Sequence, residues 1–472
     1  MTASANQVLN SSDHWAKLFS AQRLGSNKKA PAQDSARSSF HKDYDRLVFS
    51  HSFRQLNQKT QVHPLTNQLG IHTRLTHSLE VSCIGRSLGI MAAEKLHDEL
   101  DSGLPNGVAP ADVGVIVQAA CLAHDIGNPP FGHAGEYAIR DWFMHPDRQK
   151  VLHNLSSNEQ LDLLAYEGNA QGFRILARNE HHPDLGGMRL TCATLGAFMK
   201  YPWLATHSNG IYQGSPTTNM QKFGCFYSEA AQLEELAVCL HLPRSEQHDG
   251  FARHPLAYLL EAADDICYAL IDLEDGINLN MLSYAEVAAI FYELIGEHPD
   301  TLNLPPHVSV RQHLASLRAR AMMRLVNAVT DAFVANSNAM LAGKLQGSLF
   351  AHCDATVQSG ITQAKQLARE KIFNHPSKVR MELMANQCLQ RLLDAFMPLA
   401  WTNETSASIT HMSFEQQRLL KLLQPHLDEH RRVLSDDTYH NMLNVLDFIT
   451  GMNDHEAYRL AQELQGHWGT IV

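Results

Sequence analysis

Long hydrophobic runs are missing from this sequence of 472 residues. The longest mainly apolar stretch, Val113 to Ala123, is interrupted by Gln118 and is far shorter than the roughly 20 residues that span a bilayer. The first residues also lack the apolar segment of a signal peptide. These absences exclude a membrane-spanning protein and predict a cytoplasmic one.

Cysteine and positive charge are also scarce. The 8 cysteines are scattered without a CxxC pair, which predicts free thiols in a reducing compartment. The 38 Lys and Arg residues are outnumbered by 49 Asp and Glu residues. The net charge of −11 excludes a strongly basic nucleic-acid coat protein, although a local basic groove stays open as an alternative.

The remaining composition is that of an ordinary globular protein, with 44% hydrophobic and 18% charged residues. It excludes overall disorder and a collagenous or coiled-coil rod. At about 150 residues per domain, the length predicts roughly three domains or one large helical domain with elaborations. The 28 histidines raise the expectation of metal or proton chemistry without locating it.

Helical periodicity dominates the chain after residue 43. Thr76 to Leu100 carries apolar residues at spacings of three to five, and Ala111 to Ala123 predicts a buried helix that ends at the breaker run Gly127 to Pro130. The next helix is expected from His133 through Phe143. Further helices are expected at 158–179, 190–200, 228–241, 255–275, 284–296, 310–341, 358–373, 377–397, 414–426 and 437–465. No convincing strand-turn-strand series interrupts them, so the predicted fold class is all-α.

Three parts are predicted along the chain. Residues 1–43 are polar with little periodicity and predict a flexible or partner-bound arm. Residues 44–300 hold the reactive side chains and are expected to form a catalytic helical core. Residues 301–472 predict a helical C-terminal extension that completes the pocket and supplies oligomer contacts.

The densest group of reactive side chains lies at residues 124–136. His124 and Asp125 are adjacent at the end of the expected apolar helix, where the terminal turn lets an imidazole and a carboxylate converge on a metal ion. Residues 74–80 bring another histidine to the start of a helix. Residues 261–268 put carboxylates inside an apolar helix, which is costly unless they are paired or metal-bound. Capping alone would be the simpler interpretation of an isolated His-Asp pair.

Together these segments resemble the HD superfamily of metal-dependent phosphohydrolases. Within it, RLTHSLEV, LAHDIGNPPFGHAGE, EGNAQ and EAADDICYALIDLEDG are similar to the deoxynucleoside triphosphate triphosphohydrolases of the dGTPase type. The resemblance covers residues 45–280 and continues less clearly to the C-terminus. It implies an HD-domain helical core and hydrolysis of a dNTP, with dGTP the usual substrate of the family, to a deoxynucleoside and tripolyphosphate.

The resemblance also implies a divalent metal ion. Its ligands would be His77, His124, Asp125 and Asp264. Two imidazoles and two carboxylates suit Mn²⁺ or Mg²⁺, or else Fe or Co, better than a closed structural zinc site. Asp265 is an alternative to Asp264, which is preferred because Tyr268 and Asp272 then follow at i+4 and i+8, in the order of the family.

A general acid or base is needed as well, since water that attacks phosphorus loses a proton and the leaving oxygen gains one. His133 and Glu136 stand at i and i+3 of a helix start, so they share a face and can form a hydrogen-bonded dyad. In the family this pair is catalytic. The resemblance implies that His133 contacts the reacting phosphate and that Glu136 orients it or shares its proton.

The substrate contacts follow from the same resemblance. A triphosphate carries about four negative charges, so basic side chains must supplement the metal. The implied contacts are Arg74, Lys200 and Lys222 to the phosphates, Tyr268, Asp272, Gln55 and Leu56 around the sugar, and Asn169 to the nucleotide. Crowding at Tyr268 and Leu56 could exclude a ribose 2′-hydroxyl. Phe373 and Glu382 are similar to segments that close the site from a neighbouring subunit.

Family members are commonly homo-oligomers, often hexamers, and some are affected by single-stranded DNA, so both are carried as expectations. Two other functions stay open. One is an HD phosphohydrolase that acts on nucleoside monophosphates or cyclic nucleotides. The other is a nucleotide- or single-strand DNA-binding regulator without catalysis, which the net charge of −11 disfavours.

Overall fold

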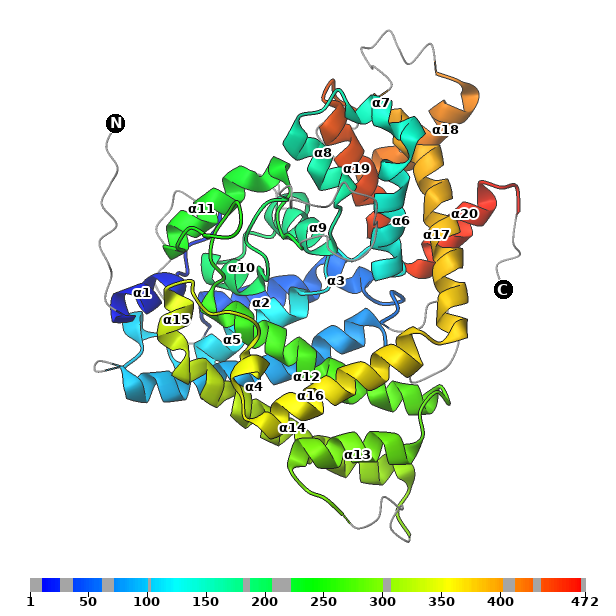
Figure 1. The fold of residues 1–472 in the computed structure, drawn as a ribbon. Helices are drawn as coiled ribbons and strands as arrows, with labels where there is room; N and C mark the ends of the chain where they lie inside the picture. The colour runs from blue at the N-terminus through cyan, green and yellow to red at the C-terminus, as the bar shows by residue number, and fades with distance from the viewer. Residues whose placement is uncertain are drawn as a thin grey trace.

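A computed structural model describes residues 11–25, 37–61, 72–100, 103–180, 187–205, 222–299, 307–401, 412–427 and 434–467. The all-α prediction is confirmed: the described residues form helices and a few isolated β-bridges, without a sheet (Figure 1). None of the described helices is both long and apolar enough to cross a membrane.

The described part of the chain contains the helices α1 to α20. The first ten are α1 (Ser11–Leu18), α2 (Ser39–Phe49), α3 (His51–Gln55), α4 (Arg74–Glu99), α5 (Pro110–Ala123), α6 (His133–Met144), α7 (Gln149–Leu152), α8 (Ser157–Leu164), α9 (Gly168–Arg174) and α10 (Cys192–Phe198). The remainder are α11 (Ala230–Leu240), α12 (Pro255–Asn278), α13 (Tyr284–Ile295), α14 (Val310–Ala335), α15 (Ser337–Leu341), α16 (Ala355–Ala368), α17 (Pro376–Phe396), α18 (Phe414–Leu423), α19 (Thr438–Gly451) and α20 (Asp454–Glu463).

Two hydrophobic cores organise these helices. The first core is formed by side chains of α1, α2, α4, α5 and α10 to α16. The second core is formed by α6, α8 and α17 to α20, which lie together at the upper right of Figure 1. The loop between α5 and α6, residues 124–132, crosses from one to the other, because Ile126 is buried in the first core and Phe131 in the second. The most reactive segment of the sequence therefore lies at the boundary between the cores.

Helices α4 and α5 pack very closely, and glycines allow it. A Cβ atom on Gly89 would lie 2.9 Å from the Cα of Gly114, and one on Gly85 would lie 2.4 Å from the Sγ of Cys121. The side chains of α5 from Val113 to Ala123 are all buried, as expected for a helix surrounded by protein. The close approach brings the start of α4 to the end of α5.

The first hydrophobic core continues across the predicted domain boundaries at residues 43 and 300. In the predicted flexible arm, residues 1–10 and 26–36 lie outside the described residues, but α1 is packed into the first core through Trp15 and Leu18. Beyond residue 300, α14 and α16 belong to the same first core. The described part of the arm is therefore a component of the core, and the region after residue 300 contributes to both cores.

Candidate metal centre and active site

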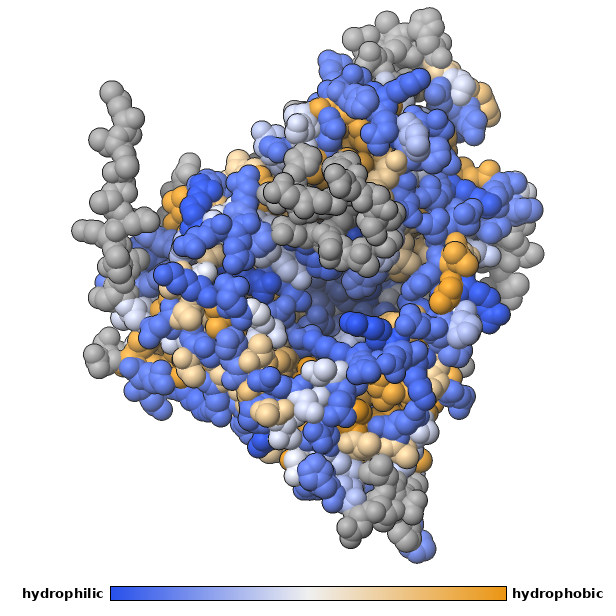
Figure 2. Space-filling view, viewed as in Figure 1, coloured by the Kyte–Doolittle hydropathy of each residue, from blue (hydrophilic) through white to orange (hydrophobic). Residues whose placement is uncertain are grey.

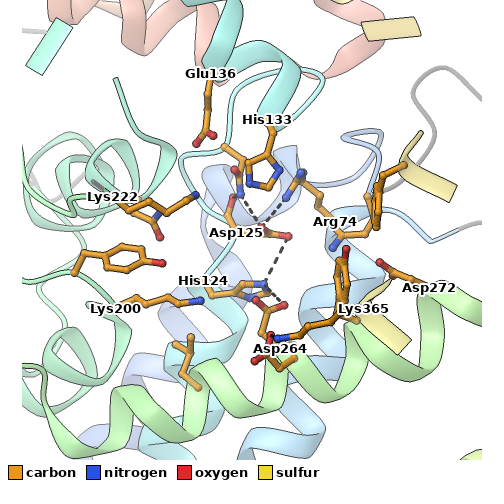
Figure 3. A pocket seen from close by; sticks show the side chains of 18 of the residues that line it. Arg74, His124, Asp125, His133, Glu136, Lys200, Lys222, Asp264, Asp272 and Lys365 are labelled. Atoms are coloured by element: carbon orange, nitrogen blue, oxygen red, sulfur yellow. Dashed lines mark hydrogen bonds and ion pairs between the residues drawn. The ribbon is translucent and has the colours of Figure 1, made fainter. Parts of the chain in front are cut away.

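Three helices carry the four predicted metal ligands or end beside them, and Figure 3 shows three of these ligands, His124, Asp125 and Asp264. His77 lies in the first turn of α4, whose N-cap Thr73 accepts a hydrogen bond from the backbone N–H of Thr76. His124 caps the C-terminus of α5, and Asp125 follows it. Asp264 is in the middle of α12. Each ligand is therefore held by regular structure or by its immediate end.

The ligand atoms lie within a few ångströms of one another. Asp264 Oδ1 is 3.1 Å from His77 Nε2 and 3.6 Å from His124 Nε2. His124 Nε2 is 3.7 Å from Asp125 Oδ2. One ligand atom each from His77, His124 and Asp125 fit within 4.8 Å of one another, a grouping that could hold a metal ion.

The hydrogen bonds around the ligands fit a divalent cation. Asp125 Oδ1 accepts from Arg74 Nη1 at 2.7 Å and from Asn128 Nδ2 at 2.6 Å, whereas its Oδ2 is buried without a partner among the described residues. The Nδ1–H of His124 donates to the carbonyl oxygen of Cys121 at 2.6 Å, which leaves the Nε2 lone pair free. An orphaned carboxylate oxygen and an oriented imidazole thus face the same point.

The two neighbouring aspartates of α12 have different environments. Asp264 faces the two histidines, while Asp265 forms an ion pair with Lys365 of α16 at 2.9 Å. Burial raises the pKa of Asp264, but His124, the hydrogen bond from His77 and Lys200 outweigh it and hold that pKa well below its usual range. Burial raises the pKa of Asp265 despite Lys365. The geometry favours Asp264 as the ligand.

His133 and Glu136 lie in the first turn of α6, across the pocket from His124 and Asp264 (Figure 3). No direct hydrogen bond joins the two in the described structure; instead Glu136 Oε1 accepts from the backbone N–H of Gly168 at 2.8 Å. Glu136 raises the pKa of His133, but burial, Lys222 and Arg74 together lower it. Burial raises the pKa of Glu136, but His133, Lys222 and Arg140 lower it more strongly, so this pKa lies below its usual value. The pair interacts through charge rather than through the expected hydrogen bond.

A cavity of about 700 Å³ joins these groups, and Figure 2 shows a hollow in the middle of this face, bordered mainly by hydrophilic residues. Of the predicted site residues, those that line it are Arg74, His124, Asp125, His133, Glu136, Asn169, Lys200, Lys222, Asp264, Tyr268 and Asp272. Lys200 and Lys222 extend from one side of the cavity and Arg74 lies on the other (Figure 3). Burial lowers the pKa of both lysines, but Glu261 beside Lys200 and Glu136 and Glu167 beside Lys222 raise it above its usual value.

Aromatic rings and a buried acid form the other end of the cavity. The rings of Tyr268 and Phe373 are stacked, with centroids 5.5 Å apart and planes 9° from parallel. Asp272, one turn of α12 beyond Tyr268, is almost fully buried, and burial raises its pKa to about 7, assisted by Asp275 and Asp264. A flat apolar surface beside a hydrogen-bonding carboxyl group suits a sugar.

Comparisons with known proteins agree with this site. An HD domain family model matches residues 74–193, which include three of the four ligands and the His133 and Glu136 pair. A deoxyguanosinetriphosphate triphosphohydrolase-like protein of Pseudomonas aeruginosa is 46% identical over 455 residues, covering 96% of this chain and 98% of the relative. A protein of the same name in Synechocystis sp. is 38% identical, covering 96% and 99%. The chain belongs to the deoxyguanosinetriphosphate triphosphohydrolase-like family.

A relative named without the suffix is more distant. The deoxyguanosinetriphosphate triphosphohydrolase of Cronobacter sakazakii is 30% identical over 482 residues, covering 89% of this chain and 92% of the relative. HD domains are metal-dependent hydrolases, and both the HD domain and these relatives support a phosphohydrolase activity. The possible metal site formed by His77, His124 and Asp125 lies in the part of the chain where the family model matches.

Some of the predicted substrate contacts differ in the structure. Gln55 and Leu56 do not occur among the described residues that line the cavity: Leu56 is buried in the first core, and the amide of Gln55 lies near Gly451. The predicted crowding of the sugar by Leu56 is therefore absent within the described residues. Glu382 is paired with Lys378 at 3.8 Å, whereas Phe373 lines the cavity from within the same chain.

Arg74 has a role that sequence reasoning missed. Its guanidinium was expected to cross the phosphates, and it does line the cavity, but its Nη1 is bound to the ligand Asp125. The position of Arg74, one helical turn before His77, does not indicate a contact with a residue 51 positions later in the chain. Arg74 therefore orients a ligand in addition to adding charge to the cavity.

Lys365 and Arg369 were also missed as cavity residues. Both line the cavity from α16 and the turn that follows, with Phe373 one turn further on. The spacing i, i+4 and i+8 places the three side chains along one face, a signal that was present in the expected helix 358–373. The other residues that line the cavity are Gln61, Asn128, Tyr137, Phe198, Tyr201, Leu260 and Asp265.

Proposed function

We propose that this protein hydrolyses deoxynucleoside triphosphates, with dGTP favoured, at the α-phosphate to give a deoxynucleoside and tripolyphosphate. The observation that carries the proposal is a cavity of about 700 Å³ that is lined by His124, Asp125 and Asp264 of the predicted metal ligands and by a set of cationic side chains. The names of the relatives support the same substrate class.

The cations favour a triphosphate over a substrate with fewer charges. The basic residues that line the cavity are Arg74, Lys200, Lys222, Lys365 and Arg369. A triphosphate brings about four negative charges, and paired cations compensate charge most strongly where water is excluded. Part of this positive charge is already balanced, since Lys200 is 3.2 Å from Glu261 and Lys365 is bound to Asp265. Lys222, whose nearest ion-pair partner Glu167 lies 3.7 Å away, is the most available of the lysines.

His77, His124, Asp125 and Asp264 would hold a divalent cation, Mn²⁺ or Mg²⁺ by preference, with Fe or Co as alternatives. When bound, such an ion supplies Lewis-acid polarisation of the phosphate. His133 is open to the cavity, and its lowered pKa keeps the imidazole neutral and able to accept a proton from the attacking water. Glu136, ionised and fixed by the N–H of Gly168, stabilises the imidazolium that forms.

The other end of the cavity would receive the deoxyribose. The Tyr268 ring, supported by Phe373, offers a flat surface, and Asp272 offers a hydrogen-bond partner for the 3′-hydroxyl. Asn169 donates to Glu167 at 3.0 Å, so its carbonyl oxygen is left for the nucleotide. This arrangement supports a nucleotide over a simple polyphosphate.

The experiment is an incubation of the Mn²⁺-loaded protein with each of the four dNTPs, GTP and dGMP. We expect tripolyphosphate from dNTPs, identified by ion-exchange chromatography, with dGTP hydrolysed fastest. His124→Ala should remove the activity, because it deletes a ligand. Release of only orthophosphate or pyrophosphate from every dNTP would contradict the proposal.

Lys222→Ala separates the triphosphate reaction from that of an HD phosphohydrolase for monophosphates or cyclic nucleotides. Loss of a charge-assisted phosphate contact should raise the KM for dGTP by about tenfold or more, while dGMP turnover changes little. Arg74→Ala is unsuitable, because it also releases Asp125. Nucleotide binding that persists in saturating Mn²⁺ without any turnover would favour a purely regulatory protein.

The proposal includes two properties of the assembled protein. We expect a homo-oligomer, possible hexamers included, and light scattering after size exclusion measures its mass. Single-stranded DNA is proposed as a regulator, and a change in dNTP turnover on adding an oligonucleotide at fixed salt tests it. A monomeric mass, or turnover that is indifferent to DNA, removes the corresponding expectation.

A further inference from the structure

Asp454, the first residue of α20, reaches the loop in front of the candidate catalytic pair from the far end of the sequence. Its carboxylate is fully buried. Oδ1 accepts from the backbone N–H of Phe131 at 2.8 Å, and Oδ2 accepts from the N–H of Thr60 at 3.1 Å and from its hydroxyl at 2.8 Å. Both oxygens are therefore used to hold backbone segments that lie more than 300 residues earlier.

The segment that Asp454 holds has a demanding conformation. Phe131 has φ of 65° and Gly132 has φ of 60°, and His133 follows directly. A left-handed backbone is unfavourable for phenylalanine, so it persists only where the surroundings impose it. The hydrogen bond to Asp454, together with burial of the Phe131 ring in the second core, imposes it here.

A buried lysine ties the other part of the loop to the same C-terminal helices. Lys59 Nζ donates to the carbonyl oxygens of Asn128 at 2.8 Å and of Thr450, near the end of α19, at 2.7 Å. Burial lowers the pKa of Lys59 to about 8. The side chain of Asn128 in turn donates to the metal-ligand candidate Asp125. The link from α19 thus continues to the ligand cluster.

Helix α19 also contacts α9, the helix whose first residue donates a hydrogen bond to Glu136. Asp447 accepts from Arg174 Nη2 at 2.8 Å and from Gln171 Nε2 at 2.6 Å, so it fixes α9. Helix α9 begins at Gly168, whose N–H donates to Glu136. The C-terminal helices therefore contact the structure behind both members of the His133 and Glu136 pair.

We propose that α19 and α20 position the loop of residues 124–132, the catalytic loop. We further propose that Asp454 is the positioning residue that sets the place of His133 over the reacting phosphate. The expected effect on kcat rests on the proposed function, whereas the expected effect on the order of the loop does not. A positioning role differs from a purely stabilising role in what it changes: the folded variant should bind substrate and metal normally and turn substrate over slowly.

The kinetic test compares Asp454→Ala with Asp454→Asn in the full-length, Mn²⁺-loaded protein, at a temperature well below the melting point of each. We expect Asp454→Ala to lower kcat for dGTP by at least about tenfold, with KM and Mn²⁺ affinity within about threefold of the wild type. Asp454→Asn should recover part of kcat. Its amide oxygen can keep the bond to Phe131 and its NH₂ can donate to the Thr60 hydroxyl, but the backbone N–H of Thr60 then loses its acceptor.

A second readout does not depend on the substrate. Hydrogen exchange followed by mass spectrometry should show faster exchange in peptides covering residues 126–137 in Asp454→Ala, with peptides from α14 unchanged. Glu463→Gln, at the exposed end of the same helix, is the matched control and should leave both readouts at wild-type values. If Asp454→Ala does not fold, the same two readouts in Asp454→Asn test the role of Asp454, and Lys59→Met tests the separate link from α19 to Asn128.

The outcomes separate the two hypotheses. A folded Asp454→Ala protein with wild-type kcat and wild-type exchange at residues 126–137 overturns the positioning role. Absence of dNTP hydrolysis in the wild type overturns the proposed function alone, since the exchange measurement still decides whether Asp454 holds the loop.

Discussion

At the scale of single residues, the site depends on which of two neighbours faces the ligand cluster. Asp264 and Asp265 differ by one position on α12, which rotates the side chain by about 100° around the helix axis. That rotation places Asp264 beside His77 and His124, and places Asp265 beside Lys365. One carboxylate is therefore available to a cation, while the other is neutralised by a lysine.

Asp264→Asn should consequently weaken metal binding much more than Asp265→Asn. We expect Asp264→Asn to weaken Mn²⁺ binding by at least roughly 100-fold, because it removes a charged ligand from the centre. Asp265→Asn should stay within about threefold of the wild type, since its carboxylate serves the ion pair with Lys365. Titration calorimetry with Mn²⁺ measures both affinities, and the reverse order would make Asp265 the ligand.

At the scale of elements, the spacing of α4 and α5 fixes the distance between the two histidine ligands. His77 begins α4 and His124 ends α5, and their ring centroids are 5.4 Å apart. That distance depends on Gly89, where the backbone of Gly114 leaves no room for a Cβ atom. A helix-internal glycine is intrinsically unfavourable by about 1 kcal/mol relative to alanine, so its presence here reflects packing.

Gly89→Ala should therefore destabilise the protein although alanine is the better helix former. The new methyl group would meet the Cα of Gly114 at 2.9 Å and the carbonyl oxygen of Val113 at 3.0 Å, and neither backbone atom can rotate away. We expect a net loss of about 1–3 kcal/mol in the free energy of unfolding. Urea denaturation measures it.

Gly451→Ala is the matched control for that experiment. Gly451 ends α19, and a Cβ atom there would meet only the amide of Gln55, at an ordinary 3.7 Å. Alanine should be neutral or stabilise the protein by up to about 1 kcal/mol. Equal stability of Gly89→Ala and wild type would show that α4 and α5 can separate without cost.

The sequence predicted these elements well where the signals are local. The helix before His124, the breaker run and the helix that starts at His133 correspond to α5, the 124–132 loop and α6, because Pro, Gly and apolar periodicity act over a few residues. The expected helix 437–465 is instead two helices, separated where Asn453 caps α20. Asn453 stands inside an apolar pattern that continues on both sides of it, so the pattern alone does not show that a new helix begins there.

Long-range polar contacts could not be predicted. The bond between Arg74 and Asp125, the ties from Asp454 to Phe131 and the link from Lys59 to Thr450 join segments that are 51, 323 and 391 residues apart. Each residue is polar and ordinary in its local context. Only the three-dimensional arrangement shows that they are buried and that they contact the loop of residues 124–132.

At the scale of the whole molecule, helices from both terminal regions of the chain are part of the two cores on which the site is built. The second core contains α19 and α20 from the C-terminal region, together with α6. The first core contains α1 from the N-terminal region, together with α4, α5 and α12, which carry the ligand candidates or end beside them. Segments outside the matched HD domain, residues 74–193, are therefore part of the structure that supports it.

Trp15 tests the contribution of the N-terminal end. Its ring is 1% exposed, is stacked on Phe19 with centroids 5.4 Å apart, and lies 6.3 Å from the ring of Phe333 in α14. Next to it, the Nε2–H of His254 donates to the carbonyl oxygen of Leu18 at 3.1 Å, and burial lowers the pKa of His254 to about 4. The segment is thus bound to the core by both apolar and polar contacts.

Trp15→Ala should cost about 3–5 kcal/mol in the free energy of unfolding, because it leaves a large cavity between α1 and α14. Phe49→Ala, at a ring that is 77% exposed, is the control and should change stability by no more than about 0.5 kcal/mol. Urea denaturation of both variants gives the comparison. If Trp15→Ala is as stable as Phe49→Ala, the result supports the flexible or partner-bound arm that was predicted for residues 1–43. If it is destabilised as expected, the fold extends to its N-terminal helix, and truncation of that helix would weaken the core that carries the metal centre.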